Sequence, residues 1–286
     1  MTNNAKWDLF RMQNVVLWTR QIGIANYDFA FRRYFDCRSV IGGMGESVLL
    51  RIGAIEDFHL IENKVHQMGM RLLCSEQAYQ RASLIEHWYT LIKEYTPKTK
   101  VFDVFPSLEE VERDFSFPIF VKGSRQTHGH RKESSIVDSP QAFLALREKW
   151  TYNKYLYWQK VAIREYVKLQ VIDEHTFADI VPICYEFRFF FWKKVLVGYG
   201  PYWTFGPSYE LGQEEAKQVG ALANKIAELV DVPFLAVDMA KKEDGEWLVI
   251  EVNDGQESGY SGASPLVLWN NILAIEDGRR EAVKIV

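Results

Sequence analysis

The sequence predicts an α/β fold, because stretches with the spacing of strands alternate with stretches with the spacing of helices. Near the start, two short apolar runs flank residues 55–68, whose apolar positions recur as on one face of a helix. Near the end, the segment 234–254 surrounds Asp244-Gly245, a dipeptide typical of a two-residue hairpin loop. Helices together with antiparallel strands favour layered α+β units over an all-helical or all-β architecture.

The composition is that of an ordered globular protein. Of 286 residues, 48% are hydrophobic and 25% are charged, which excludes disorder as the main state. The net charge of −4 gives no reason to expect nucleic acid or a membrane surface as a partner. Three widely spaced cysteines and the absence of a signal peptide or a long apolar run indicate a cytoplasmic protein without a disulfide framework or zinc site.

The first third of the chain indicates a small α/β domain. Short buried strands are expected at 14–19 and 48–52, whereas residues 23–47 between them match no pattern of regular structure. Gly69 marks the end of the helix that follows, because glycine tolerates the left-handed conformation that closes helices. The elements expected next are a helix at 55–68, a strand at 71–74 and a helix that reaches residue 94.

The middle third repeats the alternation around a polar loop. Ser107 and Glu110 form a capping box that opens a short helix, and Ser139-Pro140 opens another helix with proline at its first position. The loop at 123–135 has no apolar side chain that could anchor it, so we expect it to be mobile. The strands expected here lie at 100–105, 118–122 and 161–167.

The last third is dominated by strands. Residues 186–200 predict one hairpin and residues 234–254 predict a second. Between them, apolar residues on a single face predict a helix over 214–230. A glycine-rich segment, NDGQESGYSGAS, and a short helix close the chain.

The second hairpin gathers acidic side chains. With Asp244-Gly245 as a two-residue loop, Asp238 lies directly opposite Glu251, and Asn253 shares their face because side chains two apart on a strand point the same way. Two opposed carboxylates repel each other, so a cation is expected between them. Oxygen ligands without histidine or cysteine suit Mg²⁺ or Mn²⁺.

The alternative is that this face simply contacts water. Against it, the same face carries Phe234, Ala236, Trp247 and Val249, which are too apolar for a solvated surface, so we interpret the patch as the wall of a cleft. The opposite face is wholly apolar and is the predicted core, made of Leu235, Val237, Met239, Leu248, Ile250 and Val252.

Two basic positions could hold phosphate. Lys122 ends a strand and precedes the loop that contains Arg125 and Lys132, and the alternative is a lysine beside a solvated loop. Arg188 could neutralise a transferred phosphoryl group, and the alternative is an ion pair with Glu186 on the same strand face. No HExxH, GxSxG, Walker or GxGxxG pattern occurs, so serine hydrolases, P-loop NTPases and dinucleotide oxidoreductases lack support.

The order of these fragments resembles the ATP-grasp superfamily. The fragments are FPIFVKG, the basic loop, IREYV, EFRFFFW, and VDMA followed by WLVIEVND, and together they cover roughly residues 98–262. The ordered series is far more specific than any of its members. The stretch at 48–79 also resembles the N-terminal domain in the branch of the superfamily that is named for an arginine-to-lysine replacement.

The resemblance implies an N-terminal pre-ATP-grasp α/β domain at 1–97, followed by two α+β subdomains that close on ATP. The small subdomain covers 98–172 and contains the mobile phosphate loop, and the C-terminal subdomain covers 173–286 and contains the metal site. The loop departs from the pattern, since Gly123 and Gly129 are its only glycines. The roles implied are phosphate contact for Lys122 and Lys132, an adenine-holding hinge for Glu165, Tyr166 and Val167, phosphoryl contact for Arg188, metal binding for Asp238, Glu251 and Asn253, and ribose binding for Asp173 or Glu174.

The activity that the resemblance implies is an ATP- and Mg²⁺-dependent ligase. It would join the carboxylate of an amino acid, peptide or protein to an amine or thiol through an acyl phosphate, and it needs no protein nucleophile. A kinase that phosphorylates a small molecule and a non-catalytic nucleotide-binding module are the alternatives, and a homodimer stays open as the oligomeric state. The substrate side is expected in the N-terminal domain and in loops 199–212 and 255–264. Arg51, in the N-terminal domain, is either a ligand of a substrate carboxylate or a structural surface residue.

Overall fold

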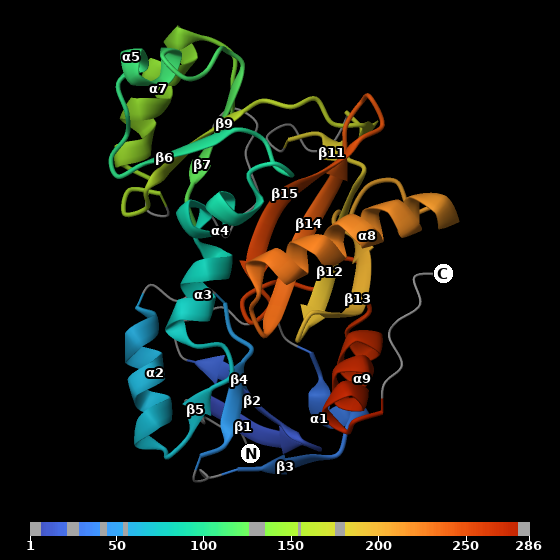
Figure 1. Cartoon of the computed structure of the whole chain (residues 1–286). Helices are drawn as coiled ribbons and strands as arrows, with labels where there is room; N and C mark the ends of the chain where they lie inside the picture. Colours follow the sequence, from blue (N-terminus) through green and yellow to red (C-terminus); the bar gives the residue numbers. More distant parts are fainter. Residues whose placement is uncertain are drawn as a thin grey trace.

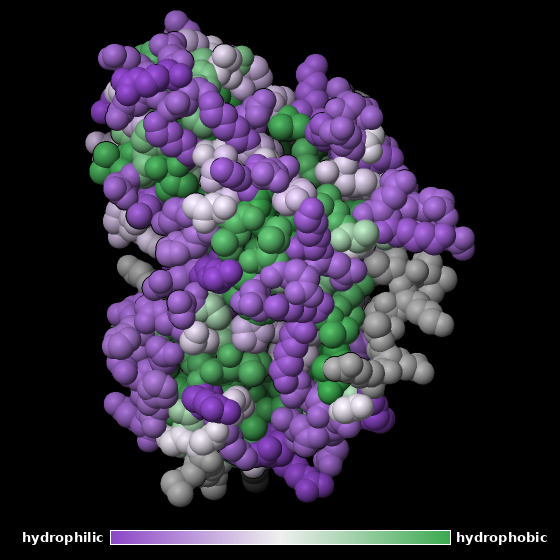
Figure 2. Space-filling model, in the orientation of Figure 1, coloured by the Kyte–Doolittle hydropathy of each residue, from purple (hydrophilic) through white to green (hydrophobic). Residues whose placement is uncertain are grey.

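A computed structural model of the chain describes residues 7–21, 29–40, 45–53, 57–125, 135–153, 156–174 and 181–279. Within these ranges the strands form one five-stranded sheet, two four-stranded sheets and a two-stranded ribbon, with helices packed against them, which confirms the α/β class (Figure 1). On the face shown in Figure 2 the outer surface is mostly polar, and hydrophobic residues gather where helices meet sheets. No helix in the described part of the chain is long and apolar enough to cross a membrane.

The N-terminal sheet has the strand order β3-β1-β2-β4-β5. Its first hairpin was only half predicted, because β1 lies in residues to which the sequence assigned no element. The chain reverses at Gln13, which takes a left-handed conformation (φ 49°) that glutamine rarely adopts, so the turn has no strong sequence signal. The elements are β1 (Trp7–Met12), β2 (Val15–Gln21), α1 (Phe31–Tyr34), β3 (Cys37–Ser39), β4 (Ser47–Leu50), α2 (Phe58–Gln67) and β5 (Arg71–Leu72).

The single helix expected to reach residue 94 is in fact two helices, α3 (Glu76–Ser83) and α4 (Ile85–Ile92). Leu84 between them is extended, with φ −104° and ψ 123°. The amide of Ile85 donates to the carbonyl of Ser124 at 3.2 Å instead of to a helical carbonyl. A long-range hydrogen bond therefore breaks a helix whose residues would otherwise allow it to continue.

The second sheet has the order β6-β9-β7-β8 and is covered by two helices. The capping box of Ser107 and Glu110 and the helix start at Ser139-Pro140 are both confirmed. Phe143, Leu146 and Trp150 pack against the apolar face of the sheet in a core of its own. The elements are β6 (Thr99–Phe102), α5 (Leu108–Glu112), β7 (Ile119–Gly123), β8 (Ile136–Val137), α7 (Pro140–Thr151) and β9 (Val161–Glu165).

The third sheet is antiparallel, with the order β13-β12-β14-β15. One face packs against α4 and α8, and one end of the other face packs against α9 and the N-terminal sheet (Figure 1). Lys193 and Lys194 both have positive φ and form the two-residue turn of the first hairpin. The elements are β10 (Val171–Asp173), β11 (Ile183–Cys184), β12 (Glu186–Trp192), β13 (Val195–Pro201), α8 (Gln213–Val230), β14 (Phe234–Lys241), β15 (Trp247–Asp254) and α9 (Pro265–Glu276).

The hairpin of β14 and β15 differs from the prediction in two ways that cancel. The loop has three residues, 243–245, because Lys242 and Glu246 still pair through their backbones. A β-bulge at Ile250 then restores the register, so that Asp238 pairs with Glu251 and Ala236 pairs with Asn253, as predicted. The faces at the start of β15 are consequently exchanged. Trp247 and Val249 pack into the core, whereas Ile250 lines a cavity beside Glu251.

Candidate active site

A row of charged side chains crosses the central sheet. Arg188 on β12 pairs in register with Asp238 on β14, and Asp238 pairs with Glu251 on β15. Phe190, Ala236 and Asn253 form the next row. The buried end of this face is apolar and packs against the N-terminal sheet, whereas the end with the charged row faces the second sheet. Because side chains alternate between the two faces of a strand, these three paired residues place their charged groups side by side on one face of the sheet.

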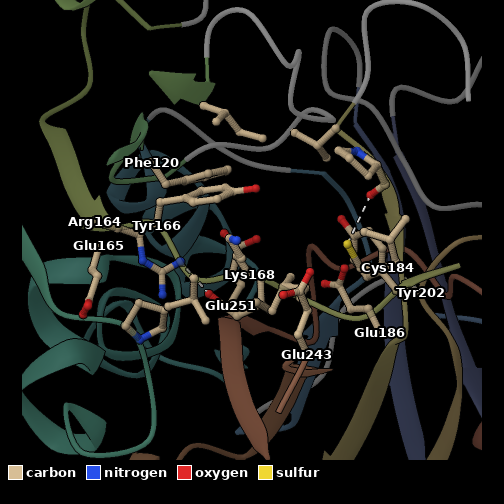
Figure 3. Close-up of a pocket in the computed structure, with 18 of the residues that line it drawn as sticks. Phe120, Arg164, Glu165, Tyr166, Lys168, Cys184, Glu186, Tyr202, Glu243 and Glu251 are labelled. Carbon is tan, nitrogen blue, oxygen red and sulfur yellow. Dashed lines mark hydrogen bonds between the residues drawn. The ribbon is translucent and has the colours of Figure 1, made fainter. Parts of the chain in front are cut away.

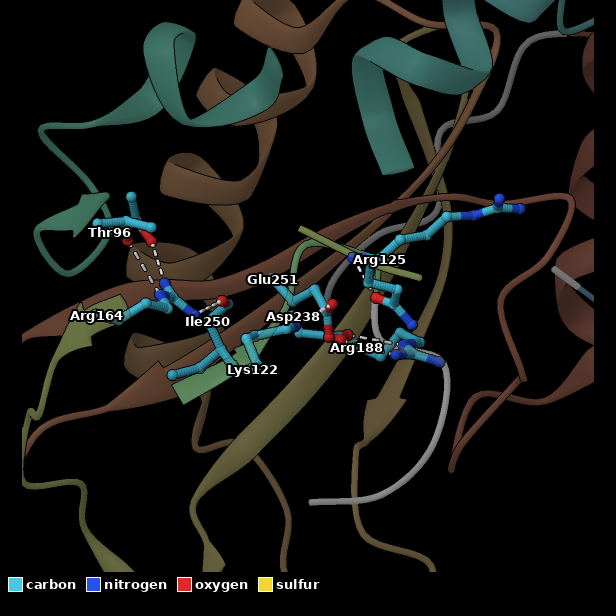
Figure 4. A network of polar contacts seen from close by, with 10 residues as sticks. Thr96, Lys122, Arg125, Arg164, Arg188, Asp238, Ile250 and Glu251 are labelled. Carbon is cyan, nitrogen blue, oxygen red and sulfur yellow. Dashed lines mark hydrogen bonds and ion pairs between the residues drawn. The ribbon is translucent and has the colours of Figure 1, made fainter. Parts of the chain in front are cut away.

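Lys122 reaches this row from the other sheet. It lies near the end of β7, and its Nζ donates to Glu251 Oε1 at 2.5 Å across the space between the sheets (Figure 4). The two side chains are only 2% and 14% exposed, so this ion pair is buried. The second and third sheets thus meet through an ammonium and a carboxylate that are 129 residues apart in sequence.

Arg188 is held in place by hydrogen bonds from three of its guanidinium nitrogens. Its Nε and Nη2 each donate to one oxygen of Asp238 at 2.7 Å, which is the bidentate geometry of a strong pair. Its Nη1 donates to the carbonyl of Gly259 at 2.9 Å, and the guanidinium lies 4.9 Å from the ring centre of Tyr202. Although burial lowers the pKa of Arg188, the contact with Asp238 raises it above its usual range, so the group stays charged. The ion pair with Glu186 that we considered as the alternative is not the one that forms.

The site carries an excess of carboxylates. Glu186 is buried near the row, and burial, then the charge of Asp238, raise the pKa of Glu186 well above its usual range. Lys122 and Arg188 contact Glu251 and Asp238, which leaves Glu186 as the third carboxyl group of the cluster. A cluster in which three carboxyl groups accompany two cations offers the oxygen ligands that a divalent ion such as Mg²⁺ prefers.

A cavity of about 330 Å³ opens from this cluster toward the segment that follows β9 (Figure 3). Lys122, Glu186 and Glu251 line its polar end. Its other end is mostly apolar and is formed by side chains from both sheets, so the predicted cleft is present. The lining there includes Phe120, Ile136, Tyr166, Val167, Leu169, Val181, Pro182, Cys184 and Ile250.

Arg164 on β9 is buried and lines the cavity, where its guanidinium donates three hydrogen bonds. It donates to Thr99 Oγ1 at 3.1 Å, to Thr96 Oγ1 at 2.8 Å and to the carbonyl of Ile250 at 2.7 Å (Figure 4). Burial lowers the pKa of Arg164 to about 10, so it is still a cation at neutral pH. Arg164 therefore links β9 of the second sheet to the bulge of β15 in the third sheet.

The structure brings most of the predicted site residues together. Lys122, Glu165, Tyr166, Val167, Glu174 and Glu251 line the cavity, and Asp238 and Arg188 lie behind Glu251. In Figure 3 the carboxyl group of Glu165 points away from the other lining side chains. Asn253 lies one row further along, and Asp173 is paired in the ribbon with β11 but does not line the cavity. Lys132, Gly129 and most of the loop at 123–135 lie outside the described residues.

Sequence reasoning missed other lining residues. Tyr202, Trp203 and Lys168 line the cavity, but they lie in irregular segments that carry no motif. Arg51 was taken as either a substrate ligand or a surface residue, yet it is 1% exposed and donates to the carbonyls of Gly255 and Gln256 at 3.2 and 2.9 Å. The available signal was the position of Arg51 at the end of an apolar strand, which favours burial. The expectation of a surface position was therefore wrong.

One family model matches the chain over residues 92–272, more than half of its length. It describes an ATP-grasp domain, the third family of the clade that is named for an arginine-to-lysine replacement. A search of curated proteins found no match.

Several solved structures with a similar fold are distant in sequence. A RimK-domain ATP-grasp protein from Sphaerobacter thermophilus is 14% identical, with a TM-score of 0.53 over 76% of this chain and 75% of that one. The VanG D-Ala:D-Ser ligase from Enterococcus faecalis is 16% identical, with a TM-score of 0.53 over 77% and 68%. The D-alanine–D-alanine ligase from Bacillus anthracis is 15% identical, with a TM-score of 0.51 over 77% of both chains. These likenesses concern the fold.

Proposed function

The chain belongs to the ATP-grasp domains of the arginine-to-lysine clade, and from this premise we propose that it is an ATP-dependent ligase that joins a carboxylate to an amine. The observation that carries the proposal is the cleft in which Lys122 of one sheet meets Glu251 of the other beside a largely apolar cavity. A nucleotide needs both features, an apolar slot for its base and fixed cations for its phosphates. Enzymes of similar fold include D-Ala:D-Ser and D-alanine–D-alanine ligases.

We place the adenine in the apolar end of the cavity and the phosphates at its charged end. Tyr166 and Val167 directly follow β9 and line the apolar end, which supports a hinge role for Glu165–Val167. Glu174 also lines the cavity and is the better candidate for the ribose hydroxyls than Asp173. Lys122 lies at the polar end, where its ammonium can turn from Glu251 to a phosphate oxygen.

Asp238, Glu251 and Asn253 would hold Mg²⁺, or Mn²⁺, and the bound ion would supply neutralising charge to the phosphates. The surplus of buried carboxyl groups around Asp238 supports this assignment. When Lys122 and Arg188 act on phosphate, the carboxylates that they contact in the free protein need another cation. The two assignments therefore support each other.

In the proposed reaction the residues of this chain position groups and stabilise charge. Arg188, which Asp238 and Gly259 hold in place in the free protein, would turn its guanidinium to the transferred phosphoryl group, and Lys122 would neutralise a phosphate oxygen. The walls contributed by both sheets exclude water from the acyl phosphate, which water would otherwise hydrolyse. The amine attacks that intermediate directly, so the reaction requires no protein nucleophile.

We further propose that residues 1–97, 98–172 and 173–286 act as the pre-ATP-grasp domain, the ATP-grasp small subdomain and the metal-binding subdomain. The three sheets within these limits support the division. All three cysteines are free thiols, which supports a reducing compartment such as the cytoplasm.

The proposal is tested by incubating the protein with ATP, Mg²⁺ and a pool of carboxylic acids and amines, followed by mass spectrometry. A ligase yields ADP, phosphate and a new amide mass. A stable phosphate ester would instead identify a kinase, and a thioester would identify a thiol as the acceptor. Nucleotide binding without any turnover would contradict the proposal and identify a binding module.

A further inference from the structure

Residues 255–262, here called the bridging segment, lie between the N-terminal sheet and the charged row of the central sheet. The segment directly follows β15, the strand that carries Glu251 and Asn253. Side chains from both sheets bond to its backbone (Figure 1). They are Arg51, which directly follows β4 of the N-terminal sheet, and Arg188 on β12 of the central sheet.

Arg51 holds the beginning of the bridging segment. Its Nη1 donates to the carbonyls of Gly255 and Gln256 at 3.2 and 2.9 Å. Its Nε donates to the hydroxyl of Tyr260 at 3.4 Å, and its guanidinium lies 4.5 Å from the centre of that ring. The backbone amide of Leu50 adds a bond to Gln256 Oε1 at 3.0 Å. Because Arg51 is 1% exposed, its removal would leave buried carbonyls without these donors.

The central sheet holds the later part of the bridging segment. Arg188 Nη1 donates to the carbonyl of Gly259 at 2.9 Å, and the amide of Gly262 donates to the carbonyl of Pro201 at 2.8 Å. Gly200 pairs with Arg188, and a Cβ at Gly200 would clash with the backbone of Gly262. The glycines therefore allow the segment to pack directly against β13, the strand beside the one that carries Arg188.

The guanidinium of Arg188 bonds to Asp238 through two nitrogens and to Gly259 through the third (Figure 4). In the proposed reaction Arg188 turns from Asp238 to the transferred phosphoryl group. The bond of Nη1 to Gly259 can be kept during this turn, since it uses a different nitrogen. Gly259 follows Gln256, which Arg51 holds, by three residues, a span of about 10 Å at most. The position of the Gly259 carbonyl thus depends on Arg51.

We propose that Arg51 is a positioning residue for phosphoryl transfer and acts through the bridging segment on Arg188. This inference rests on the proposed function. Among the residues that the structure describes, Arg51 does not line the cavity in which we place the nucleotide, so its effect is indirect. By holding the carbonyls of Gly255 and Gln256, Arg51 sets the direction in which Arg188 reaches the terminal phosphate. The placement of such a cation is a main contribution of a protein to phosphoryl transfer.

The test measures by calorimetry how the full chain binds Mg-ADP and a non-hydrolysable Mg-ATP analogue. Because Arg188 acts on the terminal phosphate, the wild type should bind the ATP analogue more tightly than ADP. Arg51→Met removes the donors and should weaken the ATP analogue by about tenfold, since a charge-assisted contact is misplaced, with little change for ADP. Arg51→Lys keeps a buried cation but lacks the forked geometry of arginine, so its loss should be smaller.

A double-mutant cycle distinguishes positioning from a structural role. If Arg51 acts through Arg188, Arg51→Met should cause no further loss for the ATP analogue in the Arg188→Met protein. Val65→Ala is the control for stability, because Val65 is fully buried in the core of the N-terminal sheet. This control should leave the ratio of the two affinities unchanged. Hydrogen exchange of residues 255–262 should become faster in both Arg51 variants but not in Val65→Ala.

Four results would overturn the proposal. They are equal binding of the two nucleotides by the wild type, an equal loss for both nucleotides in the Arg51 variants, an equal loss in the Arg188→Met protein, and unchanged exchange of the bridging segment. Selectivity for the ATP analogue that does not respond to Arg51 defeats the positioning role alone. A wild-type chain that binds neither nucleotide defeats the proposed function, and the positioning role with it.

Discussion

Replacing Glu251 with glutamine separates the structural role of this carboxylate from its proposed metal-binding role. From the sequence alone, two opposed carboxylates would repel, and removal of one charge would leave the metal-free protein as stable as before or more stable. The structure predicts the opposite, because Glu251 neutralises Lys122, which is 2% exposed. In Glu251→Gln the buried ammonium loses its counter-charge.

The expected destabilisation follows from the burial of the pair. Breaking a buried ion pair by removing one partner costs about 3–5 kcal/mol, because a charge is left uncompensated. Relief of the repulsion between Asp238 and Glu251 offsets roughly 0.2–1 kcal/mol of this. A net loss of about 2–5 kcal/mol corresponds to a melting temperature lower by roughly 4–20 °C for a chain of this size.

The assay is thermal unfolding of the metal-free protein beside ATP turnover. Glu251→Gln should melt lower and lose turnover by orders of magnitude, since Mg²⁺ is no longer held correctly. The double variant Lys122→Met, Glu251→Gln removes both charges and should recover most of the stability but none of the turnover. An unchanged or raised melting temperature in Glu251→Gln would refute the account of the ion pair, and near-normal turnover would refute the metal assignment.

Three further outcomes are expected. Calorimetry should show that ATP binds more tightly than GTP and only with Mg²⁺, and equal metal-free binding of both nucleotides would contradict the site. Burial raises the pKa of Asp254 to about 7 from its usual 3.8, so the folded state binds the extra proton. Stability should therefore fall as the pH rises from about 4 to 7, and Asp254→Asn should flatten this slope in melting curves; an unaltered slope would refute the role of Asp254. Burial, and then the charge of Glu186, raise the pKa of Cys184 to about 12. At pH 8, iodoacetamide should therefore label Cys184 far more slowly than the more exposed Cys37, which peptide mass spectrometry can measure. Equal labelling rates would contradict the burial of Cys184.

The sequence was sufficient to predict that Asp238 pairs with Glu251 and Ala236 with Asn253, although two errors in the predicted hairpin compensated for each other. A two-residue loop at Asp244-Gly245 is the usual choice for that dipeptide, and the real loop has three residues. At the bulge at Ile250, which corrects the register, Arg164 of another sheet donates to the Ile250 carbonyl. Such a contact has no local signature, so the faces of Trp247 and Val249 were predicted incorrectly.

Long-range pairs account for most of what the sequence did not reveal. Lys122 was recognised from its strand end, but its pairing with Glu251 spans 129 residues, and nothing local indicates it. Arg188 was assigned on its strand, yet its partner proved to be Asp238 on the neighbouring strand instead of Glu186. Local patterns therefore located the charged groups, and only the packing of the sheets determined how they pair.

Isotope transfer tests most directly whether the chain activates a carboxylate as an acyl phosphate. The protein is incubated with ATP, Mg²⁺, a pool of amines, and a pool of carboxylic acids whose carboxylates carry heavy oxygen. If an acyl phosphate forms, one heavy oxygen appears in the released phosphate and a new amide forms. Phosphate released without the label, or label retained in a stable phosphate ester, would contradict it.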